Sequence, residues 1–588
     1  MKNIDVVMEI CGSAGEGTIS SGEILARLMS SRGFEIMSFD SYPAEIRGFG
    51  KCVAHIRISN RPIYSPGKFS DILISLNDAH SISRLPRLKK GAILIYDNQP
   101  ARVHAEDESV AGMARPDIIS YGVPLHMLAH KAAGNSRGRN MVALGAIASL
   151  LGLEKQSFIL SIQSRFKGKN QAVIDANTES FVLGFDWTDE NIKKKDAYSF
   201  KNAKQRMSTG RKLIVDGNQL VARAALDAGL KFYAGYPITP ATGIMEILSR
   251  ELPKHGGTLL QTEDEIAAIG AVIGAGFGGI RAMTATSGPG FALMTEFAGL
   301  SVMAEVPAVI VNSQRGGPST GIPTKVEQSD FNAAVYGGTG DSPRVVLAPA
   351  DTASCYDAVV LALYFAEKYQ TLVIVLMDFF LSGSIRNIDV PAKIQKKFLD
   401  ANITPDAGEL KDYKRYRITS SGISPRAIPG MKNAVFFSTG LEHDERSRPD
   451  YSEKGHLEMT AKRFRKLETL GREAPLPAVF PEHLTEADIG IVSWGSSAGA
   501  AYEASTLARD QGINAACFSS VMLSPFPEKQ LISFAEKCRQ ILVPELNFSG
   551  QFADFVTKIL KRKVEKLNFI SGRPMASEDI LQKIKDMV

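Results

Sequence analysis

The sequence has 588 residues, of which 44% are hydrophobic and 22% are charged, and its formal net charge is +5. At ~150 residues per domain, a chain of this length predicts about four domains. The composition is ordinary for a soluble globular protein. A nearly balanced charge argues against general nucleic-acid binding, although it is compatible with a local basic groove for a phosphorylated cofactor.

The apolar segments and the cysteines exclude two further classes of protein. No segment reaches ~18 uninterrupted apolar residues, so we expect no membrane span. The apolar run at the N-terminus predicts a first β-strand rather than a signal peptide. The five cysteines form no CxxC motif, which disfavours a disulfide framework and an iron–sulfur cluster held by this chain alone. They are Cys11, Cys52, Cys355, Cys517 and Cys538. We therefore expect a cytoplasmic protein that receives any cluster chemistry from another chain.

The predicted elements begin with a domain at residues 1–190. A strand at 4–11, a helix at 18–32 and a strand at 34–39 follow one another, which is the order that starts a parallel α/β domain. Further elements are expected at 71–76 and 92–96 (strands) and at 140–151 (a buried helix). A lysine-rich linker is predicted at residues 191–212.

A second α/β domain is predicted at residues 213–385. Its strands are expected at 232–235, 281–286, 308–312, 345–348 and 371–377. A helix is expected at 352–368, with Asp351 as its N-cap.

The remainder divides into a strap and a third α/β domain. Residues 386–481 are charged and proline-punctuated, and they are too long for an ordinary loop, so we expect a strap over other domains or partners. The domain at 482–588 is predicted to contain strands at 489–494, 515–518 and 540–544 and a helix at 499–509. The chain is thus predicted to be a multidomain α/β protein built on parallel sheets.

The motif Tyr-Pro-Ile-Thr-Pro at residues 236–240 follows a predicted strand. Pro240 suits the first turn of a helix, which makes Thr239 a candidate N-cap and Thr242 its rival. Backbone N–H groups and a threonine hydroxyl at such a helix start can receive a carboxylate. The alternative is a rigid turn that only starts a helix.

Residues 262–265 (Thr-Glu-Asp-Glu) form a T-x-x-E capping-box pattern before an apolar helix, so Glu265 has a purely structural explanation. Gly270, Gly274 and Gly278 recur in that helix, and a close backbone approach by a neighbour would rationalise them. A carboxylate at the head of a buried helix is costly without a partner, and the ring nitrogen of a cofactor would be such a partner.

Two glycine-rich loops follow the next strands, at residues 286–290 and 314–321. The glycines would let the backbone of these loops approach another group closely. Arg315 could bind a carboxylate or phosphate through two hydrogen bonds. The alternative for Arg315 alone is a solvated loop side chain. Ligands of open α/β sheets collect at the carboxyl ends of strands, which favours the binding interpretation for three successive loops.

These segments together resemble the α subunit of the 2-oxoacid:ferredoxin (acceptor) oxidoreductases, the family of the 2-oxoglutarate and pyruvate enzymes. The resemblance covers nearly the whole chain, and it rests on motifs in the second domain, the strap and the C-terminal domain. These motifs are YPITP at 236–240, EIAAIGA at 265–271, TATSGPGF at 284–291, QRGGPSTGIPT at 314–324, YKRY at 413–416, SPR at 424–426, GLEH at 440–443, SPFP at 524–527 and ELN at 545–547.

The resemblance implies a pyrimidine-binding (PYR) type domain for thiamine diphosphate and a transketolase-C-like domain at the C-terminus. It implies that Glu265 contacts ring atom N1′ of the aminopyrimidine as the catalytic residue, and that Thr239 and Arg315 bind the carboxylate of the substrate. The further cofactor-binding residues that it implies are Pro237, Ile238, Ser287 and Gly288.

The implied reaction is the thiamine-diphosphate-dependent and coenzyme A-dependent oxidative decarboxylation of a 2-oxoacid to an acyl-CoA and CO₂, with ferredoxin reduced. Family prevalence favours 2-oxoglutarate as the substrate. The family carries its diphosphate and Mg²⁺ site on a β subunit, in a GDG…N motif that is absent from this sequence. We therefore expect no metal ligands here, a β subunit that also holds the iron–sulfur cluster, an (αβ)₂ heterotetramer, and no nucleic-acid or membrane partner.

The N-terminal domain resembles the γ subunit of the same family. Its glycine turn at residues 12–17 carries Glu16 where the family usually has glutamine, and residues 47–49 (Arg-Gly-Phe) depart from the usual Arg-Gly-Gly. A scaffold that closes over coenzyme A and a plain structural domain are both open, and a dinucleotide site with Asp40 as ribose ligand has the wrong glycine spacing. For the whole chain, a non-oxidative transketolase-like subunit and a non-catalytic assembly paralogue are the alternatives.

Overall fold

The structure is a computed structural model that describes residues 4–42, 50–99, 109–201, 212–474 and 486–588. It contains two compact units: Met1–Val215 with Ser384–Val390, and Asp216–Gly383 with Pro391–Val588. Three predictions therefore fall at least partly outside the described residues: the Arg-Gly-Phe motif at 47–49, much of the linker at 191–212, and the end of the strap at 386–481.

The first unit is built on one mixed sheet, in which eight strands are described in the order β6-β5-β4-β1-β3-β2-β14-β7. The strands are β1 (Asp5–Ser13), β2 (Glu35–Ser41), β3 (Lys51–Ser59), β4 (Ser70–Ser75), β5 (Leu88–Asp97), β6 (Ile119–Val123), β7 (Lys212–Val215) and β14 (Ile385–Asp389). The strands predicted at 4–11, 34–39, 71–76 and 92–96 are confirmed.

The first two predicted strands do not pair with each other. Strand β3, which the sequence analysis missed, lies between β1 and β2 and pairs antiparallel with both. The parallel part of the sheet runs instead through β1, β4, β5 and β6. A strand buried on both faces reads as one continuous apolar run, and β3 interrupts that run with His55 and Arg57, which hid it.

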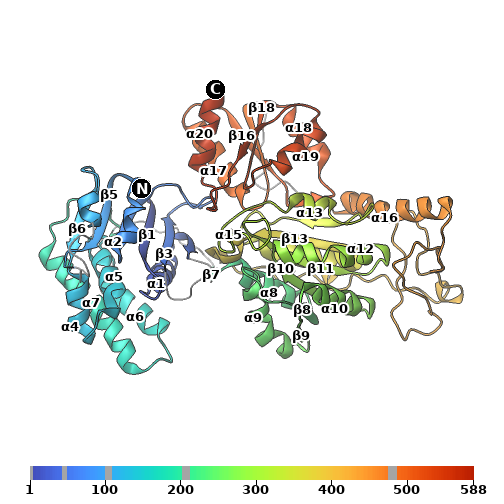
Figure 1. Ribbon diagram of the computed structural model, residues 1–588, viewed down its shortest axis with the longest axis horizontal. Coiled ribbons are helices and arrows are strands. Elements are labelled where there is room, and N and C mark those ends of the chain that lie inside the picture. The colour runs from blue at the N-terminus through green and yellow to red at the C-terminus, as the bar shows by residue number, and fades with distance from the viewer. Residues whose placement is uncertain (1–3, 43–49, 100–108, 202–211, 475–485) are drawn as a thin grey trace. The chain divides into compact units, whose positions relative to one another are not determined.

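Helices cover both faces of this sheet (Figure 1). They are α1 (Thr18–Ser31), α2 (Asp78–Ile82), α3 (Val110–Met113), α4 (Leu125–Ala133), α5 (Arg139–Leu150), α6 (Lys155–Arg165) and α7 (Gln171–Asn191). The larger core joins alternate strand residues to α1 and α4–α7. Helices α5 and α7 meet at glycines, since a Cβ on Gly145 would lie 2.2 Å from the Phe181 carbonyl oxygen and one on Gly184 would lie 2.2 Å from the Val142 carbonyl oxygen.

The second unit contains a large sheet in which seven strands are described, in the order β17-β12-β13-β11-β10-β8-β9. The strands are β8 (Phe232–Gly235), β9 (Thr258–Gln261), β10 (Ala282–Thr286), β11 (Ala308–Gln314), β12 (Val345–Leu347), β13 (Leu372–Asp378) and β17 (Met522–Ser524). All five strands predicted for the second domain are present. Their buried runs of branched apolar residues are typical of parallel strands covered on both faces.

The helices of the large sheet precede and follow its strands in an alternating order. They are α8 (Gly217–Asp227), α9 (Thr242–Glu251), α10 (Glu265–Phe277), α11 (Gly288–Leu293), α12 (Thr295–Met303), α13 (Phe331–Tyr336), α14 (Ser354–Tyr369) and α15 (Phe379–Gly383). Helix α14 begins at Ser354, and the predicted cap Asp351 accepts the Ser354 amide hydrogen through Oδ1 at 2.8 Å.

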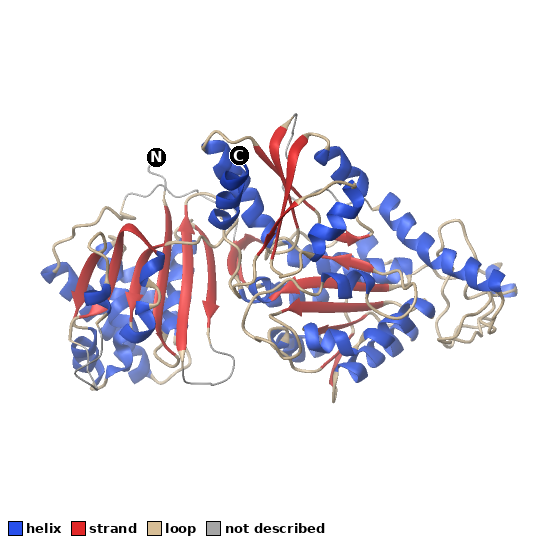
Figure 2. Cartoon of the chain, turned by 45° about the horizontal axis from the view of Figure 1, so that its top comes forward, coloured by secondary structure: helices blue, strands red, loops and turns tan. Residues whose placement is uncertain are grey.

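The C-terminal part of this unit forms a smaller parallel sheet in the order β16-β15-β18-β19 (Figure 2). Its elements are β15 (Ala487–Ser493), α17 (Ser497–Asp510), β16 (Ala515–Ser519), α18 (Glu528–Ala535), β18 (Cys538–Glu545), α19 (Gln551–Leu560), β19 (Glu565–Asn568) and α20 (Ser577–Met587). Strand β17 leaves this part and pairs antiparallel with β12, so the two sheets share one core.

The strap contains a long helix that the sequence analysis missed. Helix α16 (Glu453–Glu473) has 21 residues, and it buries the lysines Lys462 and Lys466 where an amphipathic helix would carry apolar side chains. Because the buried face is itself polar, the apolar spacing that signals a helix is absent. Across the residues that the structure describes, no helix is long and apolar enough to cross a membrane.

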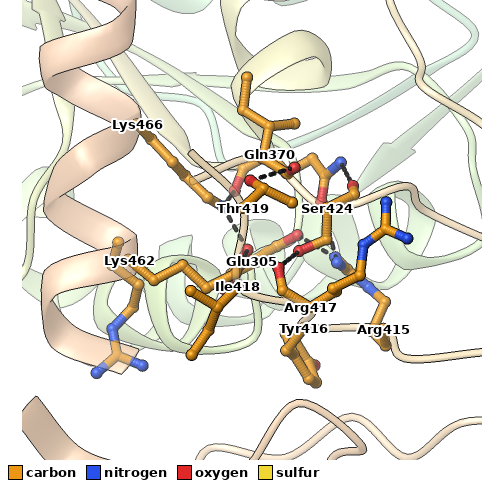
Figure 3. A network of polar contacts seen from close by, with 12 residues as sticks. Glu305, Gln370, Arg415, Tyr416, Arg417, Ile418, Thr419, Ser424, Lys462 and Lys466 are labelled. Carbon is orange, nitrogen blue, oxygen red and sulfur yellow. Dashed lines mark hydrogen bonds and ion pairs between the residues drawn. The ribbon is translucent and has the colours of Figure 1, made fainter. Parts of the chain in front are cut away.

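A buried ion cluster fixes the strap to the large sheet (Figure 3). The Glu305 carboxylate is 0% exposed and accepts hydrogen bonds from Lys462 Nζ at 2.6 Å and 2.7 Å, and it pairs with Lys466 Nζ at 2.6 Å. Arg415 donates to the Glu305 carbonyl at 2.6 Å and to Gln370 Oε1 at 3.0 Å. Residues of two strap segments therefore converge on the turns before β11 and β13.

Candidate active site

The loops that carry the sequence motifs emerge at one edge of the large sheet. Strand β8 precedes residues 236–240, β10 precedes 287–290, and β11 precedes 315–321. Strand β10 pairs in parallel with both β8 and β11, so the carboxyl ends of these strands lie side by side. This edge is where ligands of open α/β sheets bind.

The Tyr-Pro-Ile-Thr-Pro motif forms a turn that ends before the helix begins. Helix α9 starts at Thr242 and has no side-chain cap, so both predicted caps, Thr239 and Thr242, are wrong. The Thr242 amide donates to the Ile238 carbonyl, and the Pro240 carbonyl accepts from Asn218 Nδ2 at 2.9 Å. The first bond closes the turn, and the second joins the turn to α8. The helix begins only after the residues of this turn.

Glu265 is the first residue of α10 and is 5% exposed. The predicted capping box is wrong, because Asp264 is the N-cap and accepts the Ala267 amide hydrogen at 2.8 Å. Thr262 Oγ1 donates instead to the Asp264 carbonyl at 2.8 Å. Within the described ranges, Glu265 has no hydrogen bond or ion pair to another side chain. A nearly buried carboxylate without a capping role is available to a ligand.

Gly290 determines where the Glu265 carboxylate can lie. A Cβ on Gly290 would stand 2.3 Å from Glu265 Oε1 and 2.3 Å from Thr286 Oγ1, which is closer than any van der Waals contact. The carboxylate therefore lies directly against the backbone of α11. A side chain at this position of the Ser-Gly-Pro-Gly sequence would displace the Glu265 carboxylate.

The expected close approach at Gly270, Gly274 and Gly278 is wrong within this chain. A Cβ on Gly274 would meet nothing within 4 Å among the described residues, and one on Gly270 would meet only the Phe297 ring at an ordinary 3.4 Å. The close approach occurs at Gly276, where the Pro307 carbonyl oxygen would lie 2.3 Å away. The predicted glycines lie on the more exposed face of α10 instead.

Arg315 is 7% exposed and lies directly after β11. Its Nη1 donates to the Thr239 carbonyl at 2.7 Å, and its Nη2 donates to the Thr320 carbonyl at 3.2 Å. Burial lowers the pKa of Arg315, and the charge of Glu265 opposes that shift. Arg315 Nε is buried without a partner among the described residues. The structure thus brings Arg315 and Thr239 into contact and keeps Glu265 within electrostatic range.

Ser287 and Gly288 lie at the start of α11, beside a polar pair that the sequence analysis missed. Ser287 Oγ is buried and has no partner in the described part of the chain. A Cβ on Gly288 would stand 3.0 Å from Asp330 Oδ2, which accepts from Asn312 Nδ2 at 2.9 Å. Burial raises the pKa of the Asp330 carboxyl. The sequence feature that could have indicated this pair is the run of polar residues at 312–315, which ends an otherwise apolar strand.

Pro237 and Ile238 lie at the same edge of the sheet but apart from this hydrogen-bonded group. Pro237 is exposed and Ile238 is partly buried. Neither has a hydrogen bond to Glu265, Ser287 or Arg315 among the described residues. Their role as cofactor contacts stays a prediction.

The glycine turn of the first unit is closed by its own carboxylate. Glu16 Oε2 accepts the Ser13 amide hydrogen at 2.6 Å, and Glu16 Oε1 accepts from Arg139 Nη2 at 2.7 Å. The backbone N–H and the arginine that could bind a phosphate at this turn are therefore already used. This contact explains structurally why Glu16 is tolerated there.

Three family models match successive parts of the chain. The model described as "Pyruvate flavodoxin/ferredoxin oxidoreductase, thiamine diP-bdg" matches residues 223–462. "Pyruvate ferredoxin/flavodoxin oxidoreductase" matches residues 7–187, and "Pyruvate:ferredoxin oxidoreductase core domain II" matches residues 487–580. The first of these matches contains every predicted site residue.

Two curated relatives decide the family. The 2-oxoglutarate synthase subunit KorA of Methanothermobacter marburgensis is 38% identical over 376 residues, 63% of this chain and 98% of that protein. The 2-oxoacid:ferredoxin oxidoreductase subunit alpha of Saccharolobus solfataricus is 30% identical, over 98% of this chain and 97% of its own length. The chain belongs to the 2-oxoacid:ferredoxin oxidoreductase family. The resemblance inferred from the motifs is confirmed, and so is the assignment to this class of oxidoreductases.

A solved structure of the same family has the same fold over the whole chain. The 2-oxoglutarate:ferredoxin oxidoreductase of Magnetococcus marinus matches with a TM-score of 0.92 and 35% identity, and each chain is covered over 100% of its length. That structure has 2-oxoglutarate, coenzyme A and succinyl-CoA bound. The predicted multidomain α/β fold with a thiamine diphosphate-binding domain is confirmed.

Proposed function

We propose that this chain is the γα-type subunit of an enzyme that decarboxylates 2-oxoglutarate oxidatively, forms succinyl-CoA and reduces ferredoxin. The observation that carries the proposal is Glu265, a nearly buried carboxylate that neither caps its helix nor pairs with another described side chain. It lies at the carboxyl edge of the large sheet, within electrostatic range of Arg315.

The residues at this edge fit the aminopyrimidine end of thiamine diphosphate. Glu265 offers a carboxylate without a partner, and Ser287 Oγ and Arg315 Nε are buried polar atoms that also lack one among the described residues. Thiamine diphosphate supplies an electron sink at the 2-oxo carbon when it is bound. In our proposal Glu265 holds a proton shared with ring atom N1′, and the packed backbone at Gly290 fixes the direction of its carboxylate.

Arg315 and Thr239 are proposed to bind the carboxylate adjacent to the 2-oxo group. The Thr239 carbonyl already accepts a hydrogen bond at one edge of the guanidinium, so Arg315 has little rotational freedom left to lose on binding. The proposed cofactor contacts are Pro237, Ile238, Ser287 and Gly288, which lie in the first two of the three loops.

The rest of the cofactor site is assigned to a partner chain. The sequence lacks a GDG motif, so we propose that a β subunit binds the diphosphate and Mg²⁺, carries the iron–sulfur cluster and passes electrons to ferredoxin. We propose an (αβ)₂ assembly that is inactive without β. Within this chain the proposed domains are 1–190, 213–385, 386–481 and 482–588, with the linker 191–212.

The choice of 2-oxoglutarate is supported by the relatives. One is a 2-oxoglutarate synthase subunit, and the solved Magnetococcus marinus enzyme binds 2-oxoglutarate and succinyl-CoA. Co-purification with the β subunit, followed by assays of several 2-oxoacids with coenzyme A and a viologen acceptor, tests the choice. A higher kcat/KM for pyruvate or for a branched 2-oxoacid would contradict it.

Glu265→Gln tests the catalytic role in the same complex. We expect kcat to fall by about 10²–10⁴-fold, because the substitution removes the proton-holding group while keeping its size. Glu263→Gln is the matched control, since Glu263 lies two residues away and is exposed. Near-normal turnover of the Glu265 variant in an intact complex would remove the catalytic assignment.

A further inference from the structure

The sheet of the first unit is completed by a strand from a distant part of the chain. Strand β14 (Ile385–Asp389) belongs to the first unit, whereas the residues up to Gly383 and from Pro391 belong to the second. It lies between β2 and β7 and pairs antiparallel with both. Without β14, strand β2 would be an open sheet edge.

The Asn387 side chain continues the ladder where the backbone pairing of β14 with β2 stops. Backbone register joins Ile385 to Ser38 and Arg386 to Met37. Beyond that point Asn387 Oδ1 accepts the Ile36 amide hydrogen at 2.9 Å, and Asn387 Nδ2 donates to the Phe34 carbonyl at 2.8 Å.

These hydrogen bonds are buried. Asn387 is 5% exposed, and Ile36 and Phe34 are 0% and 1% exposed. A buried backbone donor or acceptor that loses its partner costs about 1–3 kcal/mol, and Asn387 satisfies one of each. The carboxamide therefore reproduces the two contacts of a missing strand residue.

Two further contacts fix the position of β14. Arg386 Nη2 donates to the Ile63 carbonyl at 2.6 Å. Ile385 packs against the apolar core that α1 and α4–α7 form with the sheet. Backbone pairing, a bidentate side chain and apolar packing together are the elements by which an added strand binds a sheet edge.

We infer that β14 attaches the first unit to the remainder of the chain by strand addition, independently of the covalent connection between Lys201 and Lys212, and that Asn387 is its main side-chain anchor. The edge of β2 is thus an interaction surface for an extended segment with asparagine at its third position. Strand β7 pairs with the other side of β14, so a break before Lys212 leaves the ribbon of β7 and β14 intact.

The inference is tested on the full chain with a protease recognition sequence inserted between Lys201 and Lys212. After cleavage, we expect fragments 1–201 and 212–588 to co-elute in size exclusion, and we expect the Asn387→Leu variant to separate. Asp389→Leu is the matched control, because Asp389 is exposed and belongs to the same strand. Separation of the unsubstituted fragments, or co-elution of the Asn387→Leu fragments, would overturn the inference.

Hydrogen–deuterium exchange on the uncleaved chain distinguishes lost attachment from misfolding. In Asn387→Leu we expect exchange of the Ile36 amide to accelerate at least about tenfold, which corresponds to one lost hydrogen bond of ~1.4 kcal/mol. Exchange in β4 and β5 should stay unchanged. Unchanged exchange at Ile36 would also reject the role of Asn387.

Discussion

Replacing Glu305 by glutamine should loosen the strap by an amount that depends on pH. The substitution leaves Lys462 and Lys466, which are 0% and 2% exposed, without a counter-charge. Removing one partner of a buried ion pair costs ~3–5 kcal/mol. Burial lowers the pKa of Lys466 to about 7, so Lys466 is largely neutral above that pH and adds little to the cost.

Lys462 sets the upper limit of the effect. In the variant Lys462 can lose its proton instead of staying charged in the interior. Lysine has an ordinary pKa of 10.5, so its deprotonation costs ~3.4 kcal/mol at about pH 8. The same arithmetic gives ~1.4 kcal/mol at about pH 9.5. We therefore expect a loss of ~3 kcal/mol at about pH 8 that shrinks as the pH rises.

Hydrogen–deuterium exchange of the α16 amides measures this loss locally, which is appropriate because a multidomain chain does not unfold in two states. Glu473→Gln is the matched control, because Glu473 pairs with Lys368 at 2.7 Å while its side chain is 45% exposed. We expect ~1 kcal/mol or less there. A loss at Glu305 as small as that of the control, or one independent of pH, would refute the reasoning.

Three further predictions concern the site and the strap. Gly290→Ala should lower kcat by at least about tenfold, because its Cβ would stand 2.3 Å from Glu265 Oε1, whereas Gly299→Ala, with nothing within 4 Å among the described residues, should not. Arg315→Ala should lower kcat/KM for the 2-oxoacid by about a hundredfold, the equivalent of a charge-assisted pair, and an unchanged value would place Arg315 outside the site. Lys466 should make the opening free energy of α16 rise with pH between about 7 and 10.5, since the unfolded chain then binds a proton that the folded chain lacks. Lys466→Met should reduce that rise in the same exchange measurement, and the lowered pKa of Lys462 accounts for any part that remains.

The parallel strands of the large sheet could be predicted from the sequence because burial on both faces makes them continuous apolar runs. Helix α16 could not, because its buried positions include Lys462 and Lys466, whose partner, Glu305, is more than a hundred residues away in the chain. Strand β14 was missed for a related reason. Its anchor is the polar residue Asn387, and nothing local to Asn387 shows that the edge of β2 needs a carboxamide.

The candidate site was predictable as a set of loops but not in its details. Successive strand ends placed Thr239, Glu265 and Arg315 at one edge, and their contacts agree with that placement. The capping pattern at Glu265 was misleading because Thr262 and Asp264 can each be the N-cap of this helix, and only the backbone geometry decides between them in favour of Asp264. The pair of Asn312 and Asp330 depends on a loop that returns to the strand, which local spacing does not reveal.

The strap anchor and the candidate site lie at opposite ends of the same strand. Glu305 precedes β11, and Arg315 follows it, so the seven residues of β11 separate them by about 23 Å at ~3.3 Å per residue. A change at Glu305 reaches the site only if it moves β11, all of whose residues are buried, or α10, which Pro307 contacts at Gly276. We therefore expect Glu305→Gln to change the exchange of α16 and the assembly of the complex while kcat of the assembled enzyme stays unchanged. A fall in kcat with α16 still protected would show that the two ends of β11 are coupled.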